Sequence, residues 1–260
     1  MRTNLYQHFH PDEKPFIDKA DEWLMKAAYD HQVKRTDFLD PRQAFILSAL
    51  QNRYDNIQVV FDGGYPDAER KRAIIMPDYR DPDAEEPGIE LLAISSPDAK
   101  FAELDHGDFL GAILGLGIKR EKIGDIHPSD SVCHCLAALE IIEYLDLHLR
   151  QVHRVSVLTE ILPLTELKPV PIQFDVVSFT VASLRLDAVV GDVYKLSRGK
   201  VMQPIQSGRC KVNWKVEENP ACELQAGDVV SLQGFGRFKL LEVEGPSKKG
   251  RIRVKAGKYR

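Results

Sequence analysis

The chain has 260 residues, 43% of them hydrophobic and 28% charged, and a formal net charge of −4 at pH 7. These values are typical of a globular protein with a buried core and exclude a largely disordered chain. No apolar run in the sequence reaches the roughly 18 residues of a membrane helix, and the N-terminus lacks the apolar stretch of a signal peptide. We therefore expect a cytoplasmic protein without membrane insertion.

The net charge hides an asymmetry along the chain. Residues 183–260 hold 16 Lys and Arg against 8 Asp and Glu, a net charge of +8. Residues 1–182 hold 19 Lys and Arg against 31 Asp and Glu, a net charge of −12. A basic C-terminal third on an acidic body favours a nucleic-acid partner, although a basic solubilising surface has the same charge.

Residues 1–80 are expected to form an N-terminal αβ domain. Apolar residues from Phe16 to Ala27 recur at helical spacing, and a second helix is expected after Pro41, which suits an early helical position. Strands are predicted at 57–65, which ends in a Gly-Gly pair, and at 72–77, which ends in proline.

Residues 81–180 are expected to form a middle domain with the βαββαβ order of RRM-like, ferredoxin-like folds. The patterns predict strands at 89–95, 122–127, 131–138 and 153–161, and helices at 108–117 and 139–149. An RRM normally carries aromatic residues on its two central strands, where bases stack. The strands at 122–127 and 131–138 have none, which argues against base stacking on this sheet.

Two clusters of the middle domain could carry chemistry. Lys119, Arg120 and Lys122 form a basic turn that is a secondary candidate for RNA contact, although a solvated turn is the favoured account. Cys133 and Cys135 flank a histidine, but alternate strand residues point to opposite faces, and no second Cys or His pair follows at zinc spacing. We expect core residues there, and neither a metal nor a cofactor.

Residues 181–260 are expected to form a compact αβ domain. Ser183 is predicted to cap a helix over 184–195, whose apolar residues recur at helical spacing. Ser197 is predicted to cap a second helix, and Gly208 to end it. Short strands follow. The whole chain is thus expected to be an α+β protein of three small domains.

The motifs of this last domain resemble the S-four RNA-binding domain, named after a ribosomal protein of the small subunit. The matching elements are Arg185-Leu186-Asp187, Ser197-Arg198, Gly208, Lys211-Val212-Asn213 and Gly227-Asp228. That domain usually has glycine after the asparagine, where this chain has Trp214. A β-turn at this point would lack the glycine that such turns prefer.

The charges of this domain suit the phosphates of structured RNA. Arg198 is placed in the first turn of the second helix, whose free N–H groups attract anions. Asp187 is expected to orient Arg185, and a strand through residues 209–215 would put Arg209, Lys211 and Lys215 on one face. The predicted RNA-binding residues are Arg185, Ser197, Arg198, Lys200, Arg209, Lys211, Asn213, Lys215, Arg237, Lys239, Lys248, Lys249 and Arg251.

The whole chain resembles the YlmH family of bacterial ribosome-associated proteins. The matching stretches are DFLGAILGLGIKREKIGDI, SRGKVMQPIQSG, KVNWK and GFGRFK, and a tryptophan at 214 is expected in that family. The resemblance implies a cytoplasmic protein that binds rRNA and peptidyl-tRNA on the large ribosomal subunit, in quality control of stalled translation while alanine tails are added. It also implies a looser association with cell division.

Two other functions remain as alternatives. An RNA-modifying enzyme is one, because S-four domains often accompany pseudouridine synthases and methyltransferases. However, Arg185-Leu186-Asp187 lacks the continuation of the synthase motif, and a complete Gly-rich methyltransferase loop is absent from the sequence. We therefore expect a non-catalytic protein. An adaptor that binds a division protein through its acidic N-terminal segment is the other alternative, and it is compatible with RNA binding.

Overall fold

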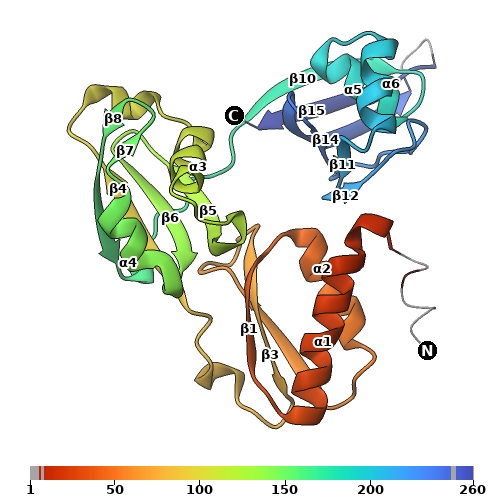
Figure 1. Ribbon diagram of the computed structural model, residues 1–260. Helices are drawn as coiled ribbons and strands as arrows, with labels where there is room; N and C mark the ends of the chain where they lie inside the picture. Colours follow the sequence, from red (N-terminus) through yellow and green to blue (C-terminus); the bar gives the residue numbers. More distant parts are fainter. Residues whose placement is uncertain (1–5, 7–8, 247–249, 260) are drawn as a thin grey trace. The chain divides into compact units, whose positions relative to one another are not determined.

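The computed structural model of the protein describes residues 6, 9–246 and 250–259, and these form both helices and antiparallel sheets (Figure 1). The expected α+β fold is confirmed. Contacts divide the chain into one unit of residues 11–170 and another of residues 171–260 together with residues 1–10. The predicted limits of three domains, 1–80, 81–180 and 181–260, stay a prediction. No described helix is long and apolar enough to cross a membrane.

The first part of unit 11–170 packs two helices on a three-stranded sheet of order β1-β3-β2 (Figure 1). Its elements are α1 (Lys14–Asp30), β1 (Lys34–Leu39), α2 (Pro41–Gln51), β2 (Ile57–Asp62) and β3 (Lys71–Pro77). A capping box between Asp40 and Gln43 starts α2, with Pro41 at the first helical position as predicted. The sequence patterns did not predict β1, which lies at an edge of this sheet.

The second part has the predicted βαββαβ order. Its main elements are β4 (Ile89–Ser95), α3 (His106–Gly115), β5 (Ile123–Pro128), β6 (Val132–Ala138), α4 (Leu139–His148) and β9 (Leu158–Leu162), with a small hairpin of β7 (Gln151–Val152) and β8 (Val155–Ser156). The sheet order β5-β6-β4-β9 is that of a ferredoxin-like fold. The central strands are β4 and β6, so the interpretation of residues 122–127 as a central strand is wrong. Neither β4 nor β6 contains Phe, Tyr or Trp.

Both faces of the two central strands of this sheet, β4 and β6, are largely buried. Leu92, Cys133 and Cys135 lie in the core on one side, which confirms that the cysteines are core residues. On the other side, Leu91 and Leu136 pack with Phe38 of β1 and are fully buried. The face that an RRM offers to bases is therefore covered in this protein.

Residues 163–170 complete this cover through two histidines. The Nδ1 atom of His134 accepts the backbone N–H of Lys168 at 3.0 Å, and Nδ1 of His127 accepts that of Val170 at 3.3 Å. Burial lowers the pKa of both imidazoles. Each ring is thus held neutral, because protonating Nδ1 would remove the acceptor of a backbone hydrogen bond.

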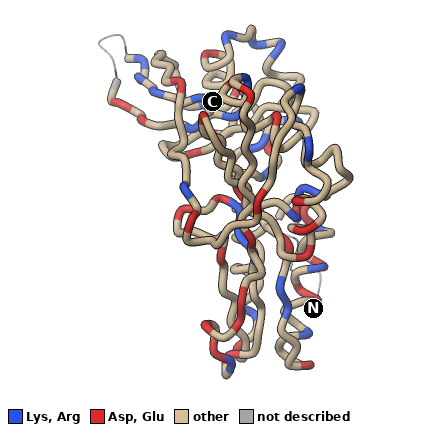
Figure 2. Tube along the Cα trace, turned by 90° about the vertical axis from the view of Figure 1, so that its left-hand side faces the viewer, with Lys and Arg blue, Asp and Glu red and all other residues tan. Residues whose placement is uncertain are grey.

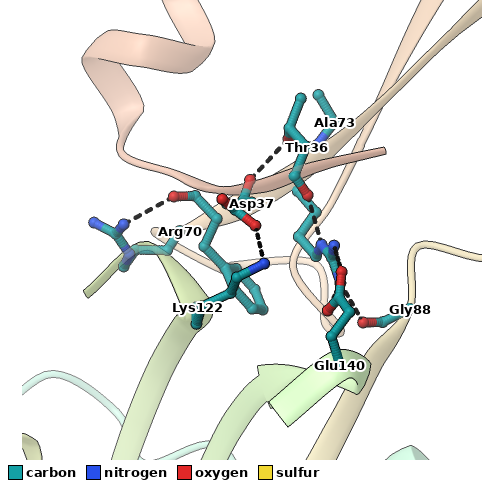
Figure 3. Close-up of polar contacts among 9 residues, drawn as sticks. Thr36, Asp37, Arg70, Ala73, Gly88, Lys122 and Glu140 are labelled. Atoms are coloured by element: carbon teal, nitrogen blue, oxygen red, sulfur yellow. Dashed lines mark hydrogen bonds and ion pairs between the residues drawn. The ribbon is translucent and has the colours of Figure 1, made fainter. Parts of the chain in front are cut away.

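Arg72 of β3 joins the two parts of this unit. Its side chain is 1% exposed, and its Nη2 lies 2.8 Å from Oε1 of Glu140 on α4. Its Nε donates to the Thr36 carbonyl at 2.7 Å, and its Nη1 donates to the Gly88 carbonyl. Figure 3 shows these acceptors around one point, beside the ion pair of Lys122 with Asp37. The buried guanidinium thus donates four hydrogen bonds, to two carbonyls and to both oxygens of Glu140, and a buried charge requires such partners.

The C-terminal unit packs two helices on one six-stranded sheet (Figure 1). Its elements are β10 (Phe174–Val181), α5 (Leu186–Tyr194), α6 (Arg198–Gln206), β11 (Cys210–Val212), β12 (Lys215–Val216), β13 (Val229–Leu232), β14 (Gly236–Pro246) and β15 (Ile252–Tyr259), and the sheet order is β10-β15-β14-β13-β11-β12. Strand β10 pairs along its whole length with β15, so residues 174–181 belong to this sheet.

The predicted cap at Ser183 is wrong. Helix α5 begins after Arg185, and the N–H groups of Leu186 and Asp187 bond to the carbonyls of Cys222 and Pro220. These backbone partners satisfy the first donors of the helix, so a side-chain cap is not needed. Ser197 does occupy the N-cap position of α6, although its side chain makes no capping bond.

We expect Glu140→Gln to lower the free energy of unfolding by about 1–3 kcal/mol, because it leaves a buried guanidinium without its counter-charge. The matched control is Glu143→Gln, which removes an exposed carboxylate from the same helix and should change little. Urea unfolding of both variants measures the difference. Equal stability of the two variants would contradict a structural role of the ion pair.

The lowered pKa values of His127 and His134 predict acid destabilisation. Both rings protonate in the unfolded chain near pH 6.5 but resist protonation when folded, so their stabilising effect is present above about pH 6.5 and is lost as the pH falls below it. Between about pH 7 and about pH 5, the free energy of unfolding should fall less steeply in a His127→Gln, His134→Gln double variant than in the wild type. His153→Asn, at an exposed histidine, should keep the slope of the wild type.

Candidate nucleic-acid interface

The starts of α5 and α6 border one open cavity of about 610 Å³. Its lining includes Arg185, Asp187, Lys195 and Arg198. Lys195 is absent from the predicted set, and it lies at the C-cap of α5 with a left-handed φ of 54°. With Asp192, three cations and two carboxylates therefore border a single hollow between two helices.

Asp187 orients Arg185, as predicted. Its Oδ1 accepts from Arg185 Nε at 3.0 Å and its Oδ2 accepts from Nη2 at 2.9 Å, a bidentate pair. Hydrogen bonding to Arg185 holds the pKa of the Asp187 carboxyl below its usual range. The carboxylate is 5% exposed, whereas Arg185 is 39% exposed, so the anion is fixed inside and the cation faces outward.

Arg198 is the second arginine near this carboxylate. Its Nη2 lies 3.9 Å from Asp187 Oδ2, and its side chain is 78% exposed. It occupies the first turn of α6, where the N–H groups of Lys200 and Val201 already bond to the Ser197 carbonyl. The N–H groups before them point out of the helix start, where the helix dipole favours an anion.

The predicted alignment of three cations along one strand is wrong for Lys215. The chain turns at Asn213 and Trp214, and β12 runs back along β11 with Lys211 opposite Val216 and Val212 opposite Lys215. Cross-strand partners share a face of the sheet. Lys215 therefore lies on the face opposite to Lys211.

Asn213 and Trp214 form this two-residue turn with φ of 49° and 65°. The Asn213 amide is used inside the domain, since its Nδ2 donates to Asp228 and its Oδ1 accepts the N–H of Val229. Such turns favour Asn followed by Gly, and a left-handed φ costs a residue with a side chain about 1–2 kcal/mol. The Trp214 ring has Arg237 5.8 Å from its centroid, a contact worth about 0.5–1 kcal/mol at an exposed site.

The other predicted cations that the structure describes do not line this cavity. Lys200, Arg209 and Lys211 are exposed, and Lys239 is partly exposed on β14. Arg251 donates from Nε to Thr180 Oγ1 at 3.1 Å. Lys248 and Lys249 lie outside the described residues. Lys and Arg outnumber Asp and Glu over residues 183–260 as a whole, and Figure 2 shows residues of both charges along much of the trace.

The secondary candidates of the middle segment are mostly used within the protein. Arg120 donates to the carbonyls of Ile123 and Gly124, and burial lowers its pKa to about 10. Lys122 Nζ lies 2.6 Å from Asp37 Oδ1. Lys119 alone of the three is exposed.

Comparisons with known proteins cover nearly the whole chain. Residues 12–80 match the family model described as "YlmH, N-terminal", and residues 82–166 match the one described as "Putative RNA-binding domain in YlmH". The chain is 40% identical over 253 residues to "Ribosome-associated protein quality control protein P2" of Bacillus subtilis (strain 168), covering 97% of each chain. It is similar to the solved structure "Cell division protein ylmH from Streptococcus pneumoniae", with 30% identity and a TM-score of 0.53, covering 62% of this chain and 97% of that one.

We expect Asp187→Asn to weaken binding of a structured RNA by about fivefold, equivalent to about 1 kcal/mol, because Arg185 loses its fixed orientation. Charge alone predicts the opposite, since removing an anion from a basic site strengthens attraction to phosphate. Asp192→Asn is the matched control, because Asp192 lines the same cavity. Tighter binding by both variants would show that the carboxylate is not a positioning group.

Proposed function

Because the chain belongs to the YlmH family, we propose that it binds RNA on the large ribosomal subunit and acts in the quality control of stalled translation. The Bacillus subtilis relative, which matches almost end to end, is named for ribosome-associated protein quality control. The single observation that carries the RNA-binding part is the pair of arginines held at the starts of α5 and α6 around Asp187.

This arrangement favours a phosphate ligand. Arg185 and Arg198 offer planar N–H forks that match two phosphate oxygens, and the start of α6 adds backbone donors. Asp187 reduces the repulsion between the two guanidiniums while the site is empty, and it keeps Arg185 in place. Folded RNA, whose backbone shape is more accessible than its base edges, is the polymer that suits this site.

The proposed partners are rRNA and peptidyl-tRNA on the large subunit, and the proposed location is the cytoplasm, where ribosomes act. The family's domain described as a putative RNA-binding domain and the ribosome association named for the relative support both proposals. The name of the streptococcal protein points to cell division, which favours a protein-binding role as a second candidate.

We propose that the protein is not a catalyst. In the pseudouridine synthase alternative, Asp187 would be the reacting carboxylate. It is 5% exposed and both of its oxygens are bonded to Arg185, so it is poorly placed to attack a base. These contacts support a positioning role for that carboxylate.

RNA binding is expected to weaken steeply as salt rises, because each phosphate contact releases counterions. Arg198→Ala should weaken binding of transfer RNA or rRNA by about 1–3 kcal/mol and should reduce the salt slope. The control is Arg154→Ala, which removes an exposed cation from unit 11–170. A salt-independent affinity, or equal effects of the two variants, would exclude Arg198 from the interface.

A further inference from the structure

The C-terminal sheet has a face that α5 and α6 do not cover. Buried residues of adjacent strands, such as Val230, Phe238 and Ala256, alternate with residues of the opposite face. The register places Lys211 opposite Ser231 and Ser231 opposite Arg237, so these three share that opposite face. The same face continues through Lys239, Tyr259 and Phe174, since Lys239 pairs with Gly257, and Phe174 with Tyr259.

Four side chains of this face form a continuous stack, here called the aromatic face: Phe174, Trp214, Arg237 and Tyr259. The Arg237 guanidinium lies 4.1 Å from the centroid of Tyr259 and 5.8 Å from that of Trp214. Phe174 meets Tyr259 edge-on, with centroids 5.0 Å apart. All four side chains are partly exposed.

A glycine fixes one end of the aromatic face. A Cβ atom at Gly257 would lie 2.7 Å from the Phe174 ring, so the ring packs directly on the strand backbone. Any residue with a side chain at 257 would displace Phe174. The ring is therefore seated in the sheet and is held close to Tyr259.

The turn at the other end of the stack carries a residue that its backbone does not favour. Trp214 has a φ of 65° at a position where glycine is preferred, and its cation–π contact with Arg237 is worth less than that conformation costs. Contacts of this pair thus do not explain why a large ring is present. Residues in such conformations often belong to functional sites.

We propose that the aromatic face stacks the bases of a single-stranded RNA segment. The inference rests on the proposed RNA-binding function and assigns this surface to unpaired nucleotides, separately from the duplex or folded RNA bound at the helix starts. Aromatic rings and an arginine plane are the groups that stack on bases of any sequence, and adjacent cations hold the backbone.

The charges on this surface favour RNA over a protein partner. Lys211, Arg237 and Lys239 lie together at the end of the sheet that includes Trp214. The carboxylates of β14 on this face, Glu242 and Glu244, are farther along the strand and pair with Lys255 at 2.7 Å and 3.4 Å. Phosphates of a strand whose bases stack on the rings would thus lie near Lys211 and Lys239, which do not pair with Glu242 or Glu244.

Tryptophan fluorescence tests this proposal directly. The chain has two tryptophans, Trp23 and Trp214, so the full-length Trp23→Phe variant reports on Trp214 alone. A short oligouridine RNA should quench this emission, because a stacked base contacts the indole ring. A Trp214→Gly variant should bind the oligouridine about 5- to 100-fold more weakly, equivalent to one lost stacked base. Its melting temperature should equal or exceed that of the wild type, because glycine relieves the turn.

Matched variants separate stacking from other causes. Trp214→Phe keeps an aromatic ring and should retain most of the affinity for oligouridine. Phe235→Ala removes an aromatic residue that is 46% exposed and packs near Tyr194, outside the aromatic face, and it should change nothing. The proposal would be overturned if oligouridine left the Trp214 emission unquenched, or if Trp214→Gly bound it as tightly as the wild type. Quenching of the emission by polyglutamate as well as by RNA would also overturn it.

The test of the aromatic face can be separated from the test of the proposed function. Arg198→Ala should weaken binding of an RNA duplex and leave the quenching of Trp214 by oligouridine nearly unchanged. Duplex binding without quenching would overturn the stacking proposal alone. Loss of binding to every RNA tested would overturn the proposed function as well.

Discussion

The proposed site depends on one buried carboxylate. Arg185 and Arg198 start two successive helices, and both guanidiniums lie near a helix N-terminus, which is itself electropositive. Without an anion between them these groups would repel, and the exposed side chains would disperse. Both oxygens of Asp187 accept hydrogen bonds from Arg185, and Oδ2 lies 3.9 Å from Nη2 of Arg198. The carboxylate thus keeps the two cations near each other in the free protein. A phosphate that enters the cavity can bind to Arg185, which is already in position, with Arg198 close by.

The middle segment shows the opposite use of a related architecture. Its ferredoxin-like sheet has the strand order of an RRM, but Phe38, Leu91 and Leu136 pack on the face where an RRM binds bases. The ion pair of Arg72 with Glu140 ties the covering segment to α4. Base stacking on this sheet would require the unit to open. We therefore propose base stacking on the C-terminal unit, whose sheet has a face that α5 and α6 do not cover.

Local patterns predicted most elements but few of the side-chain roles. The βαββαβ order and both C-terminal helices follow from hydrophobic spacing, which the observed cores confirm at Val189, Val190 and Val193. The hairpin at Asn213 was not predicted, because tryptophan is not a turn residue and only the tertiary contact with Arg237 marks it. Lys122 pairs with Asp37, a residue 85 positions away, which periodicity cannot reveal. Strand β1 was missed because three of its six residues, KRTDFL, are charged.

The central claim, that the start of α6 contacts folded RNA on the ribosome, is tested most directly by crosslinking in cells. Gly199 lies in the first turn of α6, and a Cβ atom there would meet nothing within 4 Å, so a photoreactive residue can replace it. Gly111 on α3 is exposed and equally open, and it serves as the control position. The account predicts that sequencing recovers large-subunit rRNA and tRNA together from position 199 but not from position 111. Recovery of no RNA from position 199, or of the same RNA from both positions, would contradict it.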